Sequence, residues 1–219
     1  MVFRIVQLFE ASARKDDAYK SDRETRRGLS ACASTCRAQA VRFQPLLFRH
    51  LQLSSPDDVQ QLATLVRTNC TIGEYVHSLM LMEDRGLCAH LLVILLSCRL
   101  PSLRSIALCA AAATNKYASL LELSPVLPSF SGLQTVTSLT LEDCRFRSFK
   151  GLARVISAFT KLASLHCYGL CWDSGPSVGA EGLVVPTGIS SAGDTLMDIK
   201  VNNCPQYGLF LLLFGKSMN

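Results

Sequence analysis

Cysteine and histidine are the residues of this chain that could carry nucleophilic chemistry, and the sequence holds ten of the first and four of the second. His166 and Cys167 are neighbours in a segment that we expect to be a strand. Their side chains would point to opposite faces, so they cannot form the hydrogen-bonded pair that activates a thiol. The other histidines, His50, His77 and His90, lie in no local signature of a cysteine–histidine site. We therefore predict that the chain is not an enzyme.

Metal and phosphate binding are the next possibilities. The cysteine pairs Cys32–Cys36 and Cys167–Cys171 are spaced by three intervening residues rather than two, and no second pair follows at zinc-finger spacing. On a helix the first pair shares one face, which suits metal ligands and core packing equally, and we expect packing. Gly215–Ser217 matches the end of a phosphate-binding loop, but Phe210 stands where that loop requires glycine. The sequence therefore predicts no metal and no cofactor.

Composition excludes several other classes. The chain has 219 residues, of which 49% are hydrophobic and 18% charged, so it can bury a sizeable core. Its cysteines are scattered singly through apolar segments, and we expect them to be free and buried. The net charge of +5 comes partly from Arg14–Arg27, where acidic residues alternate with the basic ones, as on a solvated helix or tail. Without a basic stripe interleaved with aromatics, we expect no nucleic-acid partner.

No membrane partner is expected either. The longest apolar run, Leu87–Ser97, is too short to span a bilayer and is more typical of a buried helix. The start, MVFRIVQLFEASARKDD, lacks the uninterrupted apolar region of a secretory signal. We therefore expect a cytoplasmic or nuclear protein.

A short pattern of apolar positions recurs five times. Val136–Cys144 (VTSLTLEDC) shows it as apolar-x-x-apolar-x-apolar-x-x-small, and Leu162–Leu170 and Leu196–Cys204 repeat it. Leu103–Ala111 ends in alanine, and Val76–Asp84 keeps only the apolar part. A spacing of about thirty residues between copies is typical of leucine-rich repeats with loop insertions.

The alternation within each copy predicts a strand with one buried face. In Val136–Cys144, the two leucines point into the core while Thr140 and Glu142 point outward. One such strand cannot cover its own apolar face, but several stacked copies form one continuous core. Cys144 and Cys204 take the small position, where a thiol can donate to a loop carbonyl. We therefore interpret Cys144 as structural rather than catalytic.

Helices are expected between the strands. Ser55–Asp58 is a helix start, with a serine cap, a proline in the first turn and acidic residues at the positive end. Ser148 caps a second helix, and Leu87–Leu96 forms a third that ends before Pro101. The apolar stripes of the first two helices are Val59, Leu62, Leu65 and Val66, and Leu152, Val155, Ile156 and Phe159. Ala110–Ser131 and Trp172–Thr195 are expected to be loops.

This alternation predicts an α/β fold, a leucine-rich-repeat-like solenoid with parallel strands inside and helices outside. Three segments follow from it. Residues 1–28 form a charged N-terminal segment, residues 29–53 a small helical segment, and residues 54–219 the solenoid.

The segment Leu29–Leu53 (LSACASTCRAQAVRFQPLLFRHLQL) differs from the repeats. Its first half is predicted to be a helix with Leu29, Cys32 and Cys36 on one stripe, and Phe48–Leu53 alternates like a strand. Cys36-Arg37 and Leu47-Phe48-Arg49 resemble the second half of an F-box. Together with the phrase LTLEDCRFRSF further on, they make most of the chain from Leu29 onward similar to fungal F-box proteins with degenerate leucine-rich repeats.

The resemblance implies a substrate receptor of an SKP–cullin–F-box ubiquitin ligase. The F-box would dock on an SKP-type adaptor, and the repeats would hold an unknown protein substrate. The adaptor-binding residues would be Leu29, Cys36, Arg37, Leu47 and Phe48. The Leu-Pro opening of an F-box and the tryptophan that often follows Cys-Arg are absent. The alternative is therefore a repeat scaffold that binds a partner without any ligase.

The binding surface is expected on the outward side of the strands, the usual binding face of such arrays. Tyrosine and methionine there are suitable anchors for a protein partner. The expected partner-binding residues are Met80, Met82, Thr140, Glu142, His166, Tyr168, Asp198, Lys200 and Asn202. Asp143 and Asn203 either belong to the same face or shape local turns.

Overall fold

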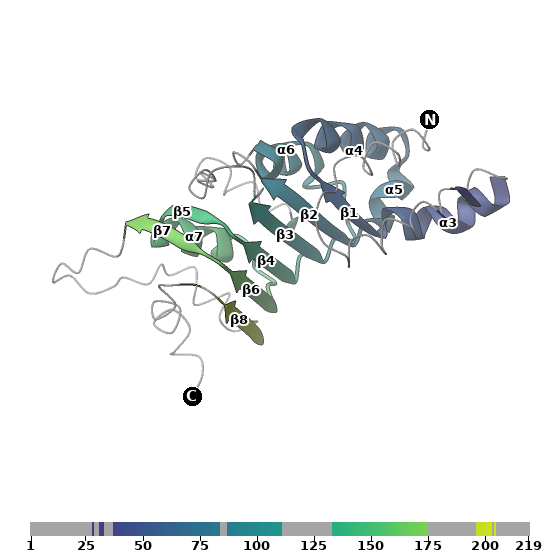
Figure 1. Ribbon diagram of the computed structural model, residues 1–219. Coiled ribbons are helices and arrows are strands. Elements are labelled where there is room, and N and C mark those ends of the chain that lie inside the picture. Colours follow the sequence, from purple (N-terminus) through teal and green to yellow (C-terminus); the bar gives the residue numbers. More distant parts are fainter. Residues whose placement is uncertain are drawn as a thin grey trace.

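The computed structural model describes residues 28, 31–32, 37–83, 87–110, 133–174, 196–202 and 204. Over these residues the chain is an α/β protein built on one six-stranded sheet and a smaller two-stranded sheet (Figure 1). The strands of the large sheet are β1 (His50–Leu53), β2 (Ser78–Glu83), β3 (Ser105–Ala110), β4 (Ser138–Glu142), β6 (Ser164–Tyr168) and β8 (Asp198–Asn202). They lie side by side in chain order, and every neighbouring pair is parallel.

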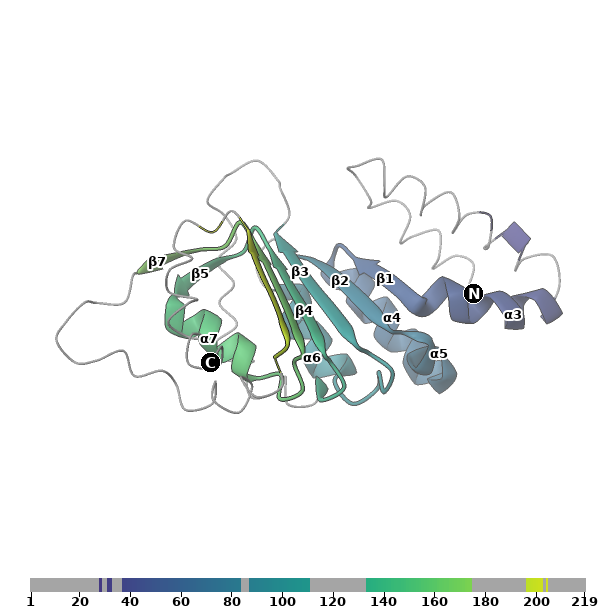
Figure 2. The ribbon, with the colours of Figure 1, turned by 90° about the horizontal axis from the view of Figure 1, so that it is seen from below.

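Helices and a second sheet connect these strands. The helices are α3 (Arg37–Arg49), α4 (Pro56–Thr68), α5 (Cys70–Tyr75), α6 (Leu87–Leu96) and α7 (Phe149–Ser157). β5 (Arg145–Ser148) pairs in parallel with β7 (Cys171–Ser174) to form the second sheet. The helices α4, α6 and α7 lie along one side of the large sheet (Figure 2).

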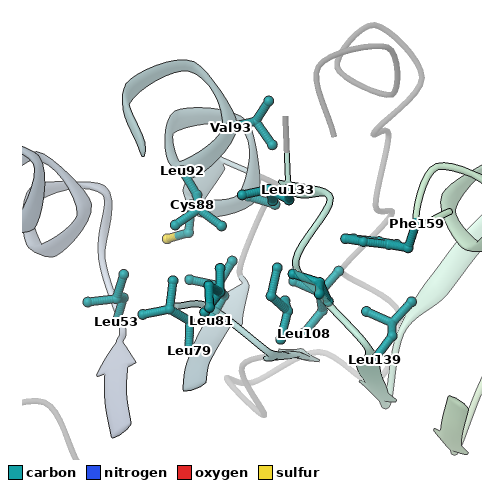
Figure 3. Close-up of a cluster of buried hydrophobic side chains, with 14 of the residues drawn as sticks. Leu53, Leu79, Leu81, Cys88, Leu92, Val93, Leu108, Leu133, Leu139 and Phe159 are labelled. Atoms are coloured by element: carbon teal, nitrogen blue, oxygen red, sulfur yellow. The ribbon is translucent and has the colours of Figure 1, made fainter. Parts of the chain in front are cut away.

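The core fills the space between the large sheet and these helices. Figure 3 shows strand leucines such as Leu79 and Leu108 reaching toward α6 and toward Phe159. The inward residues align because the strands are in register, and one such row is Leu51, Leu79, Ile106, Leu139, Leu165 and Ile199. Four of these six side chains, those of β2, β3, β4 and β6, are completely buried.

The repeat pattern predicted the strands well. Each of the five copies has its strand begin two residues after the start of the pattern, at Ser78, Ser105, Ser138, Ser164 and Asp198. A sixth copy, Phe48–Leu53, supplies β1, which pairs with β2. The segment expected at 29–53 therefore ends inside the large sheet.

The expected helix starts are confirmed. Ser55 Oγ accepts a hydrogen bond from the Asp58 backbone N–H at 3.2 Å, and an Asp58 carboxylate oxygen accepts from the Ser55 backbone N–H at 2.9 Å. This reciprocal pair satisfies donors that the first turn of α4 leaves open. Ser148 Oγ accepts from the Gly151 N–H at 3.2 Å and caps α7, where glycine has no side chain to return the bond. The third helix, Leu87–Leu96, was also predicted.

Three boundaries were predicted wrongly. α3 continues through Arg49, so Phe48 and Arg49 are helical and the strand begins only at His50. The expected loops are shorter at one end, because Ala110 closes β3 and Trp172 lies in β7. Both short strands of the second sheet were missed. The rest of those loops, residues 111–131 and 175–195, lies outside the described residues.

Candidate functional site

The face of the large sheet opposite the helices, here called the outer face, carries three in-register rows of side chains. Parallel pairing without offsets brings equivalent positions of successive strands next to each other. The rows are His50, Ser78, Ser105, Ser138, Ser164 and Asp198; then Gln52, Met80, Ala107, Thr140, His166 and Lys200; and last Met82, Cys109, Glu142, Tyr168 and Asn202.

All nine partner-binding residues expected from the sequence lie in these rows. Sequence reasoning missed the other members, which are His50, Gln52, Ser78, Ser105, Ala107, Cys109, Ser138 and Ser164. The signal for them was present, because each occupies an outward position of the alternating pattern. The sequence could not supply the strand register, which places these eight residues beside the nine expected ones.

The outer face has two chemically different halves. On β2 and β3 its row members carry hydroxyl, thioether, methyl and thiol groups and no charge, and the Cys109 thiol is buried. On β6 and β8 it presents His166, Tyr168, Asp198, Lys200 and Asn202. The outer face therefore offers an uncharged contact region next to a charged one.

A polar network links β6 to β8 on the charged half. Ser164 Oγ lies 3.1 Å from His166 Nε2, and the same nitrogen lies 3.1 Å from Asp198 Oδ2. Lys200 Nζ is 3.3 Å from that carboxylate oxygen. The hydrogen bond from His166, and then the hydrogen bond and charge of Lys200, lower the pKa of Asp198. Asp198 is thus held as a carboxylate by His166 and Lys200, and Ser164 Oγ also donates to the same oxygen at 3.5 Å.

Serine, histidine and aspartate side by side suggest a hydrolase triad, but the geometry excludes a relay. In a triad, aspartate contacts one ring nitrogen while the other nitrogen takes the serine proton. Here Ser164 and Asp198 both approach Nε2 of His166. One nitrogen cannot be oriented by the carboxylate and accept the serine proton at once. The network can orient side chains on the outer face, but it cannot activate a nucleophile in this arrangement.

The surroundings of the Cys109 thiol disfavour its thiolate form. Cys109 Sγ lies 3.4 Å from Glu142 Oε2, and burial followed by the charge of Glu142 raises the pKa of Cys109 to about 12. Burial likewise raises the pKa of Cys167, on the inner side, to about 12. The thiolate is the nucleophilic form, so neither sulfur is activated.

The predicted contact of the Cys144 thiol with backbone carbonyls is confirmed. Its side chain is completely buried, and its Sγ lies 3.3 Å from the carbonyl oxygens of both Leu108 and Glu142. Cys204 repeats the arrangement with the carbonyls of Cys167 at 3.9 Å and Asn202 at 3.3 Å. Each thiol thus satisfies carbonyls where the chain leaves its strand.

Left-handed turns close the strands at one border of the outer face. Asp143 and Gly169 follow β4 and β6 at equivalent positions, with φ of 52° and 60°. Aspartate and glycine tolerate this region better than most residues. Asp143 N–H donates to the Tyr168 carbonyl at 2.8 Å, and Gly169 N–H donates to the Asn202 carbonyl at 3.0 Å. Asp143 therefore serves the turn, while Asn203 lies outside the described residues.

The structure places the expected adaptor-binding residues in different surroundings. Leu47 and Phe48 are 4% and 1% exposed and belong to the core, where they fix the end of α3 against the sheet. In this conformation they offer no surface to a partner. Arg37 is the first residue of α3. Leu29 and Cys36 lie outside the described residues.

Other kinds of site find little support in the part of the chain that the structure describes. There, no group of three or more His, Cys, Asp or Glu side chains could hold a metal ion. No helix within the same residues is long and apolar enough to cross a membrane. Comparison with protein-family models, with curated proteins and with solved structures gives no significant match to this chain.

Proposed function

We propose that the chain is a leucine-rich-repeat-like solenoid that binds a protein partner on its outer face. The observation that carries this proposal is the set of three in-register rows opposite the helices. Such rows combine side chains from distant parts of the sequence into one extended surface, which is how repeat arrays bind proteins.

Recurring hydrogen bonds support the solenoid. The residue before each strand donates its N–H to the equivalent carbonyl of the preceding copy, in a chain of bonds that runs through the whole sheet. The bonds join His77 to Arg49, Arg104 to His77, Thr137 to Arg104, Ala163 to Thr137 and Met197 to Ala163, at 2.8–2.9 Å. The same turn is thus rebuilt in every copy, as expected when each copy is one unit of an array.

The two halves of the outer face have complementary roles in this proposal. Met80 and Met82 beside Ala107 supply an adaptable apolar contact, since the thioether side chain fits irregular shapes. Tyr168 and the Asp198–Lys200 pair supply directed polar contacts. Protein interfaces combine apolar contacts with polar, solvent-accessible ones, and the two halves supply one kind each.

Site-specific photo-crosslinking in cells tests the outer face as the binding surface. A photoreactive residue at Met80 or Thr140 should give one discrete crosslinked protein. The matched control is Ile94, which is 59% exposed on the helix side. A Tyr168→Ala change should weaken capture about tenfold, as for an aromatic anchor. Equal crosslinking from both sides, or none from the outer face, would contradict the proposal.

The ligase link is a second proposal, and it rests on the resemblance at Cys36-Arg37 and Leu47-Phe48-Arg49. α3 runs directly into β1, and Leu47 and Phe48 anchor it. An adaptor bound before α3 would therefore be held at a defined distance from the outer face. Such fixed spacing is what a substrate receptor needs.

A binding assay with a purified SKP-type adaptor tests this link. Removing residues 1–36 leaves α3 and β1 in place and should abolish binding, and Arg37→Glu should weaken it about tenfold. Arg42→Glu is the control, because Arg42 is an exposed arginine on the same helix. If the shortened chain binds as well as the full one, or neither binds, the outer face remains the only proposed function.

A further inference from the structure

The last strand of the large sheet is incompletely covered. β8 lies at one end of the strand order, next to β6. Its inward residues Leu196, Ile199 and Val201 are only partly buried, whereas their counterparts in β4 and β6 are completely buried. The neighbouring Met197 is 89% exposed. Apolar surface at this edge is thus left for another element to cover.

The hydrogen bonds of β8 show which of its backbone groups face away from β6. Asp198 N–H donates to the Ala163 carbonyl and the Asn202 carbonyl accepts from Gly169, both at 3.0 Å, so these two residues face β6. Backbone groups alternate sides along a strand, so the N–H and C=O groups of Ile199 and Val201 point away from β6. No described strand lies on that side.

We propose that β8 pairs antiparallel with β8 of a second copy of this chain, centred on Ile199. This register sets Ile199 opposite the partner's Ile199, with both backbones directing N–H and C=O groups across the interface. On the inner side, the Ile199 side chains of the two copies then meet, with Val201 of each strand diagonally beside them. Asp198 lies opposite the partner's Lys200.

The charges of Asp198 and Lys200 favour the register centred on Ile199 over the one centred on Lys200. Moving the centre to Lys200 would place two lysines directly opposite each other, which is unfavourable in a sheet. With Ile199 at the centre, two Asp–Lys pairs form across the two-fold axis. Asp198 and Lys200 already contact within one chain at 3.3 Å, so the four groups would alternate in sign around a square.

The symmetry has a consequence for the rest of the molecule. A two-fold axis perpendicular to the sheet keeps both sets of helices on one side and both outer faces on the other. The dimer would thus present one continuous face twice as wide. Pairing would also give β8 a neighbouring strand on the side where the described residues supply none, and proteins tend to protect such sheet edges.

The test is the mass of the purified 219-residue chain over a range of concentrations, by sedimentation velocity and light scattering. We expect a concentration-dependent dimer. Lys200→Asp should raise its dissociation constant about tenfold or more, because both attractive pairs become repulsive. Combining it with Asp198→Lys reverses both charges and should restore the dimer to within about threefold. Lys161→Asp, at an exposed lysine, is the control with the same charge change.

The charge swap distinguishes this dimer from other associations. An unrelated contact, or a strand added in parallel, would not be weakened by one reversal and restored by the second. A monomer at every concentration would overturn the proposal. So would a dimer that Lys200→Asp leaves unchanged or that the double variant fails to restore. Circular dichroism of each variant shows whether it is folded, and the outcome does not depend on the partner of the outer face.

Discussion

The two edges of the large sheet are built from the same sequence pattern but differ in burial. At the first edge, Leu51 and Leu53 in β1 are 5% and 0% exposed. At the last edge, Ile199 and Val201 in β8 occupy the same inward rows and are only partly buried. α3 and α4 both pack against β1. The alternating pattern thus decides where a strand forms, while the helices over it decide how much that strand stabilises the fold.

The largest expected change is in the free energy of unfolding when equivalent inward side chains at the two edges are shortened. Leu51→Ala should lower the free energy of unfolding by about 2–5 kcal/mol, because it leaves a cavity beneath covering helices. Ile199→Ala removes the same number of carbons from the same row and should have roughly half that effect, because its side chain keeps part of its contact with water. Urea unfolding followed by circular dichroism measures both.

The comparison needs a concentration at which sedimentation shows a monomer, so that pairing of β8 does not add to the result. Equal losses at the two edges would mean that Ile199 is as well covered as Leu51. That outcome would remove the physical reason for an exposed seam at β8.

Local signals made much of the fold predictable. The strands follow from alternation within about six residues, and the caps at Ser55 and Ser148 follow from a serine placed before an apolar stripe. β1 was not recognised as a sixth copy because its first apolar position, Phe48, lies at the end of a helix. RFRS and CWDS show too little alternation to predict β5 and β7, which exist because the two segments pair with each other.

The outer face was predictable in composition but not in arrangement. Outward positions such as His166 and Asp198 follow from the pattern of each copy alone. Their contact depends on the alignment of β6 with β8, across 32 residues of sequence. Nothing in either segment encodes that alignment locally. It results from packing each copy's inward residues against the next.

The next largest change in stability is expected for the turn after β6, which is bonded to β8 at the last edge of the sheet. Gly169 has φ of 60°, and a Cβ added there would collide with the side chain of Asp143. Gly169→Ala should therefore lower the free energy of unfolding by about 1–3 kcal/mol. Adding Asp143→Gly removes the collision and should recover part of the loss. Thermal unfolding of the two single variants and the double variant measures the coupling, and strict additivity would show that the two turns are independent.

A smaller loss of stability is expected when either of the two cysteines that follow β4 and β8 is replaced. Cys144 is completely buried with both carbonyl contacts at 3.3 Å, whereas Cys204 is 6% exposed and one of its contacts is 3.9 Å. Cys144→Ala should cost about 1–2 kcal/mol, and Cys204→Ala about half of that, because the last copy is less tightly packed. Chemical denaturation of both variants measures the two losses. A larger loss at Cys204 would place the better-packed end of the core at β8.

The smallest effect lies in the charged part of the last edge. The hydrogen bond from His166, assisted by Lys200, lowers the pKa of Asp198 below its ordinary value of 3.8. A carboxyl whose pKa is lower when folded adds stability above the unfolded pKa, and this stability is lost as the pH falls through the folded pKa. The Asp198 side chain is 47% exposed, so the change in stability should be small and should weaken in high salt. The ¹³C shift of its carboxyl between pH 6 and 2 gives the pKa directly, and His166→Gln should raise it more than Lys200→Gln. The reverse order would mean that Lys200, rather than the bond from β6, holds the carboxylate of the last strand.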